Sequence, residues 1–455
     1  MPFYLLLFIV CAAPLPFGAV QVGAWSLLVL SAGFLLAVWG GMVALGKAPA
    51  ITGTRPLRWA AVAFVLAMAW IVIQTASWTP AAWHHPVWTM GADGLGVPLA
   101  GRISLDPQAG ILGLTRLLAY AAIFWLAVQY GRDAGRATRG LTIFAVSGAA
   151  ASGLALLIWG VGLEAFLWFD RDFIEAQTQR GARLAIPFVN PNHLASFAGI
   201  GLICAVGLLI GETRGLWRPE TESREKLRRF IENVVVTRWY LIAAVLVYVA
   251  VLLLSRSRGG LLAALLGVAC LVVAVLWRQR PTISAAMVAT VAVLGVGAVV
   301  FAPSAGRMAD RVAGTEMGMD QRLTIYRNTI DAVAASPWLG YGHGGFPSLY
   351  RMYDEDDVTQ VVEAAHSTVL ETVAELGIPA ALVLFTAMLI PVGLCWRGVV
   401  RRRRDQHLPA IAAAMSVAVI IHSMVDFPLQ IPALATAFSF IMGLGVAQST
   451  SSKSR

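Results

Sequence analysis

Long apolar stretches alternate with short polar ones along almost the whole chain. A transmembrane helix needs about 20 mainly apolar residues, and runs close to that length recur throughout the sequence. They occupy roughly residues 3–19, 24–46, 59–76, 109–129, 141–161, 193–211, 239–255, 259–277, 283–301, 367–396, 409–424 and 431–447. The pattern predicts an all-α polytopic membrane protein with about twelve transmembrane helices. No internal repeat or low-complexity linker divides them, so we expect residues 1–455 to form one integral membrane domain.

Composition supports this fold class and narrows the chemistry. Hydrophobic residues make up 58% of the chain and charged residues 13%, which excludes a soluble domain. The first apolar run does not resemble a cleaved signal peptide, because no Lys or Arg precedes it. The adjacent His84 and His85 have no further ligands at metal-binding spacing. Four cysteines lie far apart inside apolar runs, so we expect no disulfide framework, metal or cofactor: Cys11, Cys204, Cys270 and Cys395.

Basic residues gather in alternate loops. Most of the 34 Lys and Arg residues lie in the same set of loops and in the tail. That set is 47–58, 130–140, 212–238, 278–281 and 397–408. The positive-inside rule places these loops and both termini in the cytoplasm. The run of four arginines at 401–404 is typical of a topology signal beside anionic lipid and does not predict nucleic-acid binding. The long polar segment 302–366 then faces outward, which is the periplasm if the source is a Gram-negative bacterium.

Several arginines break this charge rule, because they lie at the outer face. Arg256 and Arg258 lie in a tight turn between two apolar runs, where charge is expensive and usually faces a polar cavity or a partner. An anionic ligand accounts for them better than lipid anchoring does. Arg183 lies close to the membrane before an apolar run, where a snorkelling role and a ligand-binding role both fit. Asn190 and Asn192 precede the same run, and Asn192 is predicted to cap its helix.

The segment 302–366 is expected to carry short amphipathic helices. Residues 320–335 show helical spacing, with the polar Arg322 off an apolar stripe. The stripe consists of Leu323, Tyr326, Ile330 and Val333. The following GYGHGG formally fits a dinucleotide fingerprint, but no strand precedes it, so its glycines more simply allow a tight turn. His366 comes where this segment meets the next apolar run. It is a candidate base, with Glu363 within reach on a shared helical turn; a capping or packing role is the alternative.

An ordered set of motifs on the outer face resembles one family, the O-antigen ligase and O-antigen polymerase superfamily. No single motif is specific, but together they cover roughly residues 180–445 in the expected order. They are RLAIPFVNPNHLA (183–195), SRSRGG (255–260), RLTIYRN (322–328), PWLGYGHGGF (337–346), AHSTVL (365–370), AELG (374–377) and HSMVDFPLQIP (422–432).

The resemblance implies a metal-independent, inverting glycosyltransferase of the GT-C type in the bacterial inner membrane. Such enzymes move a glycan from undecaprenyl diphosphate to an acceptor on the periplasmic side. The family's functional histidine matches His366, and its diphosphate-binding arginines match Arg183 and Arg258, the latter better than Arg256. Further residues are expected to line the substrate site: Arg256, Arg322, Asn190, Asn192, Tyr326 and Glu363.

The chemistry of these residue types suits that reaction. A departing diphosphate needs its growing charge neutralised, and the planar guanidinium of Arg pairs well with phosphate oxygens. The acceptor hydroxyl needs a base that works near neutrality, for which His is suited. The acceptor stays open: lipid A core in a ligase, another lipid-linked glycan in a polymerase. Ser367 stands where many ligases carry Asn, and the turn SRSRGG (255–260) holds two arginines. The sequence therefore leaves both the ligase and the polymerase subtype open. A transporter or flippase of a lipid-linked glycan is the alternative from another class, although no repeat of the transporter kind is visible.

Overall fold

The computed structural model describes residues 2–48, 51, 54–161, 183–212, 224, 228, 231–276, 319–353, 362–402 and 404–450. Its regular structure, within those residues, is helical. Eight of these helices are long and apolar enough to span a membrane. They are α2 (Val22–Ala44), α3 (Thr54–Thr75), α5 (Pro107–Tyr130), α6 (Ala134–Val161), α8 (Pro191–Glu212), α11 (Arg258–Leu276), α16 (Ile378–Arg401) and α18 (Pro432–Thr450). Three shorter apolar helices accompany them: α1 (Pro2–Ala12), α10 (Trp239–Leu254) and α17 (His407–Ser423).

The predicted apolar runs correspond closely to these helices. Each run has a counterpart except 283–301, which lies outside the described residues. The first helix is shorter than predicted and ends at Ala12. Pro14 and Pro16 follow it, and proline cannot continue the hydrogen-bonding pattern of a helix interior. The apolar character of the run therefore extends further than the helix.

The predicted run 367–396 is wrong as a single helix. The structure divides it into α15 (Thr368–Leu376) and α16, with Gly377 between them at φ 76° and ψ 158°. A Cβ at Gly377 would lie 2.5 Å from the carbonyl oxygen of Trp338, so only glycine fits this close approach. Apolar composition alone does not reveal such a break, because α15 is itself amphipathic and packs on neighbouring segments outside the bundle.

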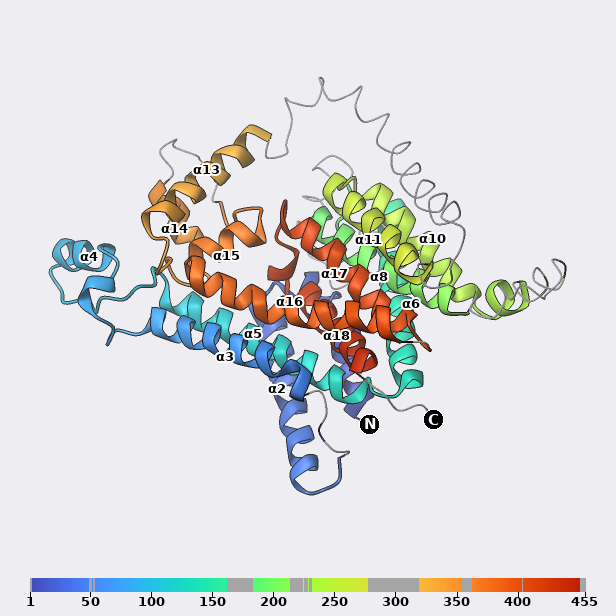
Figure 1. Ribbon diagram of the computed structural model, residues 1–455. Helices are drawn as coiled ribbons and strands as arrows, with labels where there is room; N and C mark the ends of the chain where they lie inside the picture. Colours follow the sequence, from blue (N-terminus) through green and yellow to red (C-terminus); the bar gives the residue numbers. More distant parts are fainter. Residues whose placement is uncertain are drawn as a thin grey trace.

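The helix α18 lies in the middle of the bundle, where Figure 1 shows it crossing the centre beside α16 and α17. It contacts α5, α16 and α17, while α8 contacts α6, α10, α11 and α17. Small residues allow close backbone approach, as is usual between membrane helices. A Cβ on Gly443 would lie 2.5 Å from the carbonyl oxygen of Phe124, and one on Gly207 would lie 2.2 Å from the side chain of Ile411.

The loops that the charge pattern assigns to one side meet at one end of the bundle. Arg402 donates a hydrogen bond to the backbone carbonyl of Gln448, and the Gln448 side chain donates to the Gly131 carbonyl at 2.6 Å. Arg139 donates to the Tyr4 hydroxyl at 3.3 Å near the start of α1. At the opposite end lie segments that the charge pattern assigns to the outside, among them residues 319–353 (Figure 1).

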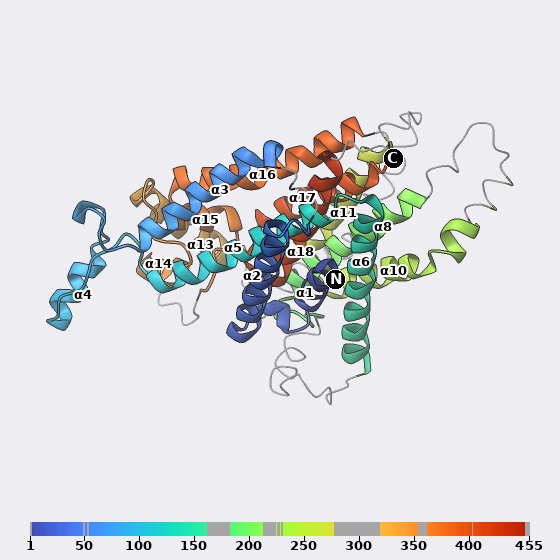
Figure 2. The ribbon, with the colours of Figure 1, turned by 90° about the horizontal axis from the view of Figure 1, so that it is seen from below.

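A small helical module occupies that opposite end. It consists of residues 319–353 and 362–376, called the outer module below, and contains α13 (Met319–Ala335), α14 (Phe346–Tyr353) and α15. Both views place these helices together at one end of the bundle, and α4 (Val87–Leu95) stands clear of it (Figure 1, Figure 2). The module has its own buried core, formed by Ile325, Ala332, Tyr341, Phe346, Leu349, Tyr350, Val362, Ala365 and Ala374.

Two side chains of α3 attach the outer module to the bundle. The buried Gln74 amide donates to the carbonyls of Leu339 at 2.7 Å and Glu375 at 2.9 Å. Trp70 donates its indole N–H to the Leu376 carbonyl at 2.9 Å. These bonds satisfy main-chain acceptors around the break at the end of α15, so they fix the start of the membrane helix α16 and the module together.

The amphipathic helix predicted at 320–335 exists as α13, but its apolar stripe is only partly the buried face: Tyr326 and Val333 are half-buried. Leu323 and Ile330 are 50% and 55% exposed. The buried face carries Ile325, Thr329 and Ala332, which have the same helical spacing. Thr329 is tolerated there because its hydroxyl donates to the Ile325 carbonyl at 2.6 Å. The sequence signal gave the correct period, while the core of the module selected the other stripe.

The GYGHGG segment forms a tight turn, as predicted. Gly340, Gly342 and Gly344 all have positive φ. The turn lies against α15, and His343 there bonds the buried carboxylate of Glu375, with 2.8 Å between Nδ1 and Oε2. The turn therefore packs on the helix that follows His366.

Substitution of Gly340 by alanine should unfold this region locally. The new Cβ would lie 2.4 Å from the Glu375 carbonyl oxygen and the Gly377 nitrogen, at a φ of +67°. We expect a loss of about 2–4 kcal/mol of local stability, read as faster hydrogen exchange of α13–α15 amides. Gly94→Ala is the control, because a Cβ there meets nothing within 4 Å. Equal exchange in both variants would contradict the close packing of the turn.

Candidate active site

His366 lies at the inner edge of the outer module, directly before α15. Its φ is +52°, which is uncommon for a residue other than glycine. The cap of α15 is Ser367, whose hydroxyl accepts from the Leu370 amide at 3.3 Å. The capping alternative considered for His366 is therefore wrong, because the next residue has that role. The imidazole of His366 therefore does not cap α15.

The imidazole of His366 sits against the turn between α17 and α18. Its ring lies edge-on to Phe427, with 5.3 Å between ring centroids. Its Nδ1 is buried and has no hydrogen-bond partner among the described residues. Burial lowers the pKa of His366; the Asp426 carboxylate opposes that change, and the Arg322 guanidinium adds to it. The ring is thus half-buried and favours its neutral, basic form.

Three arginines lie near one another, and one of them, Arg322, acts electrostatically on this ring. Arg183 donates from Nε to the Ser255 carbonyl at 3.1 Å and from Nη2 to the Arg256 carbonyl at 3.2 Å. Burial, followed by the charges of Arg256 and Arg322, lowers the pKa of Arg183. Arg322 acts on both Arg183 and His366, so it links the arginines to the histidine. Its Nε is buried without a hydrogen-bond partner among the described residues.

The α10–α11 turn presents its two arginines differently. Arg256 has a φ of +52° and is exposed, and its charge acts on Arg183. Arg258 is the exposed first residue of α11, after the cap made by Ser257, whose hydroxyl accepts from the Gly260 amide at 3.2 Å. The resemblance favoured Arg258 over Arg256 as the phosphate ligand. The charge of Arg256 acts on Arg183, and which of the two arginines binds phosphate stays a prediction.

The cap of α8 is Asn190, and the prediction that Asn192 caps this helix is wrong. The Asn190 side-chain oxygen accepts from the Asn192 amide at 2.8 Å. Pro191 is the first helical residue, a position at which its missing N–H costs nothing. Asn192 lies half-buried in the first turn, and its carbonyl accepts from Ser196 at 3.2 Å. Asn190 therefore already has a structural partner in the chain.

The structure places Tyr326 next to His366 but does not place Glu363 as predicted. The Tyr326 hydroxyl donates to the His366 carbonyl at 2.9 Å, so this tyrosine belongs to the surroundings of the histidine. Glu363 is exposed on a non-helical segment, so the predicted shared helical turn with His366 is wrong. The carboxylate whose charge acts on the imidazole is Asp426, on the α17–α18 turn.

Comparison with known proteins gives a family for this region. Residues 243–385 match the sequence profile of the family described as O-antigen ligase. This chain carries an O-antigen ligase family domain. A similar protein is the general O-oligosaccharyltransferase of Acinetobacter baylyi, 28% identical over 137 residues. The shared segment spans 30% of this chain and 23% of the relative's length.

The O-antigen ligase domain includes Arg256, Arg322 and His366, but part of their surroundings lies outside it. Arg183 precedes the matched residues, and Asp426 follows them. The site is therefore assembled from the ligase domain together with the start of α8 and the turn between α17 and α18. Among the described residues no group of three His, Cys, Asp or Glu side chains is arranged to hold a metal ion.

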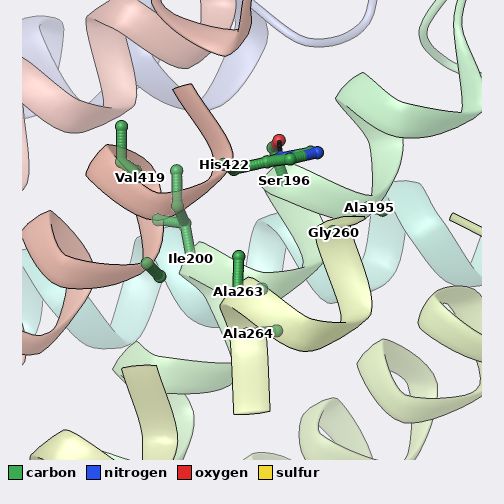
Figure 3. Close-up of a pocket in the computed structure, with 10 residues that line it drawn as sticks. Ala195, Ser196, Ile200, Gly260, Ala263, Ala264, Val419 and His422 are labelled. Atoms are coloured by element: carbon green, nitrogen blue, oxygen red, sulfur yellow. Dashed lines mark hydrogen bonds between the residues drawn. The ribbon is translucent and has the colours of Figure 1, made fainter. Parts of the chain in front are cut away.

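Sequence reasoning missed a buried polar cluster beside the candidate site. Asp426 is 1% exposed, and its carboxylate oxygens lie 3.8 Å from His193 Nε2 and 4.0 Å from His422 Nε2. His422 Nδ1 lies 2.6 Å from the Ser196 hydroxyl. Figure 3 shows these two side chains adjoining a narrow pocket walled by small residues of α8, α11 and α17. The signal was present in HSMVDFP (422–428), a polar interruption between two apolar runs on the outer side.

Proposed function

We propose that this protein transfers a glycan from undecaprenyl diphosphate to an acceptor hydroxyl at the periplasmic face of the bacterial inner membrane. The observation that carries the proposal is the grouping of Arg183, Arg256 and Arg322 beside His366. Several guanidinium groups at one membrane-level site suit a diphosphate, since each binds phosphate oxygens through a planar fork. The O-antigen ligase domain and the O-oligosaccharyltransferase relative support the same reaction class.

In the proposed reaction the acceptor oxygen attacks the anomeric carbon of the donor sugar. The bond from that carbon to the diphosphate oxygen breaks, and undecaprenyl diphosphate leaves with the electron pair. The arginines stabilise the charge that develops on the leaving group, which is often the largest single contribution to such catalysis. His366 accepts the proton of the acceptor hydroxyl. Attack from the face opposite the leaving group inverts the anomeric configuration, and no metal or other cofactor takes part.

The proposed acceptor is lipid A core, which makes the protein an O-antigen ligase in activity. The alternative is a polymerase that extends another lipid-linked glycan. Deletion of the gene followed by a lipopolysaccharide gel separates the two. Bare core with accumulated long lipid-linked glycan supports the ligase, whereas core carrying a single repeat, or a lost exopolysaccharide, supports the polymerase.

The competing function is movement of the lipid-linked glycan across the membrane without transfer. The polar residues described above gather at one face, whereas transporter sites lie near mid-membrane. Purified protein in liposomes, given an undecaprenyl diphosphate-linked glycan and lipid A core, tests this directly. We expect glycosidic transfer to the acceptor. Donor flipping with no transfer product would overturn the proposed enzyme activity.

We also propose a twelve-span topology with both termini in the cytoplasm and the outer module in the periplasm. The positive-inside pattern supports this sidedness. So does the meeting of Arg402, Gln448 and Gly131 at the end opposite the outer module.

Reporter fusions test this topology. A periplasmic reporter such as alkaline phosphatase, fused after Gly96 in the loop that follows α4, should be active. The same reporter fused after Arg404, between α16 and α17, should be inactive. A cytoplasmic reporter should give the reverse pattern at both positions. Fusions that report the same side would contradict the topology.

A further inference from the structure

The backbone of His366 needs support from its neighbours. Its φ of +52° lies in the left-handed region, which L side chains adopt only when the surrounding structure holds them there. The direction of the imidazole depends on this backbone angle. Whatever fixes the peptide groups on either side of His366 therefore also fixes where the ring points.

Two hydrogen bonds hold the main chain around His366. On the C-terminal side, the Tyr326 hydroxyl donates to the His366 carbonyl, in the peptide group that follows His366, at 2.9 Å. On the N-terminal side, the Ala365 amide, in the peptide between Ala364 and Ala365, donates to Glu371 Oε2 at 2.7 Å. The second bond is the shorter one, and its acceptor is a carboxyl group only 5% exposed.

Glu371 is one of two buried carboxyl groups on α15, and the two have different partners. Glu375, one turn later, bonds His343 at 2.8 Å and accepts from the Phe346 amide at 3.3 Å. Glu371 bonds the Ala365 amide and the side chain of Gln430. Burial, and then the neighbouring Glu375, raise the pKa of Glu371 well above its usual range, which favours the protonated carboxyl group.

The contact with Gln430 extends the support to a second element. Gln430 belongs to the 3-10 turn Pro428–Gln430, which follows Phe427. Phe427 is the ring that contacts the His366 imidazole. One carboxyl group thus joins the Ala364–Ala365 peptide, one residue before His366, to the turn against which the His366 ring packs.

We propose that Glu371 is a positioning residue that holds the His366 imidazole in its working direction through the Ala365 amide and Gln430. The proposal rests on the proposed role of His366 as the base. Glu371 itself touches neither donor nor acceptor. The proposed role requires a side chain at position 371 that is long enough to bond both the Ala365 amide and Gln430. It requires a hydrogen-bonding group at the tip of that side chain but no negative charge.

Three substitutions at position 371 separate the effect of side-chain length from the effect of a carboxylate charge. Glu371→Gln keeps both the length and the neutral end, because its amide oxygen can accept from Ala365 and its amide group can bond Gln430. Glu371→Asp keeps a carboxyl group one methylene shorter, and Glu371→Ala removes both contacts. We expect Gln to retain turnover within a few-fold of the parent. Asp and Ala should lose about 100-fold, the cost of a misplaced catalytic group.

The measurements are glycan transfer, binding of undecaprenyl diphosphate carrying a fluorescent glycan, and thermal stability of the protein in detergent. Donor binding should be unchanged in all three variants, because the arginines hold the donor. An active Asp variant beside an inactive Gln variant would overturn the proposal in favour of a charged role. Turnover that merely follows the unfolding temperature across the three variants would overturn it in favour of a structural role.

A double variant distinguishes this proposal from the function on which it rests. If Glu371 acts through His366, Glu371→Ala should cause no further loss in a His366→Ala background. Near-parental transfer by His366→Ala alone would reject the base and the positioning role with it. An inactive His366→Ala beside a folded, fully active Glu371→Ala would reject only the role of Glu371.

Discussion

Replacement of His366 by alanine is expected to reduce glycan transfer by about 100-fold or more while donor binding stays intact. A positioned general base contributes roughly 10²–10⁴-fold in rate. In the proposed reaction the arginines hold the donor, so removal of the imidazole leaves those contacts in place. Transfer to lipid A core and binding of the lipid-linked donor should be measured side by side on the same membrane-inserted protein.

His84→Ala is the matched control, because His84 also lies at the outer end and bonds only the Thr79 hydroxyl, at 3.1 Å, among the contacts described for it. It should transfer glycan at the parental rate. Near-parental transfer by His366→Ala would instead leave His366 as a packing residue against Phe427, and the base would have to be sought elsewhere.

The pH dependence of transfer gives a second measure of the same residue. Only the neutral imidazole accepts a proton, so transfer is lost as the pH falls through the pKa of His366. Burial lowers that pKa from its usual 6.5. The half-point of the acid limb should therefore lie below pH 6.5, with turnover retained between that point and neutrality. An acid limb clearly above pH 6.5 would show that another group controls the rate.

Arg183→Lys is expected to lower transfer by about 100-fold and to weaken donor binding, although the charge is kept. Loss of one preorganised donor from a site of this kind costs roughly 10²–10³-fold in rate. Lysine also cannot reproduce the fork that reaches the carbonyls of Ser255 and Arg256 from two nitrogens. Arg327→Lys, on the exposed side of α13, is the control and should be silent.

The two arginines of the α10–α11 turn make the experiment sharper. We propose Arg256, whose charge acts on Arg183, as the main phosphate ligand of this turn, so loss of its planar fork in Arg256→Lys should impair transfer more than Arg258→Lys. The reverse order would restore Arg258 as the main phosphate ligand. Full turnover and unchanged donor affinity in Arg183→Lys would mean that Arg183 only anchors the turn.

The sequence was a good guide to the membrane helices and to residues whose chemistry is out of place. Apolar runs predicted the spans because the length of a helix in a bilayer is set by bilayer thickness. The high cost of charge at membrane level drew attention to Arg256 and Arg258. His366 was chosen because it stands where a polar segment meets an apolar one and matches the family's motif, and its role stays a prediction.

The errors concern choices that only tertiary packing decides. The face that α13 buries, through Ile325 and Thr329, depends on the core of the outer module. The carboxylate near His366 is Asp426, sixty positions further along the chain by their numbering, and no local pattern pairs these two residues. Glu363 was predicted because it is only three positions from His366 in the sequence. The cap at Asn190 was missed by two positions, because two asparagines flank the proline that begins α8.

The attachment of the outer module has a consequence for how such proteins diversify. Gln74 and Trp70 bind the carbonyl oxygens of Leu339, Glu375 and Leu376, which are main-chain atoms present whatever side chains the module carries. Substitutions at exposed positions of the module therefore leave its hydrogen bonds to α3 intact. A chimera that exchanges the module as a whole therefore keeps its docking contacts, and it tests, under the proposed function, whether the module sets acceptor preference.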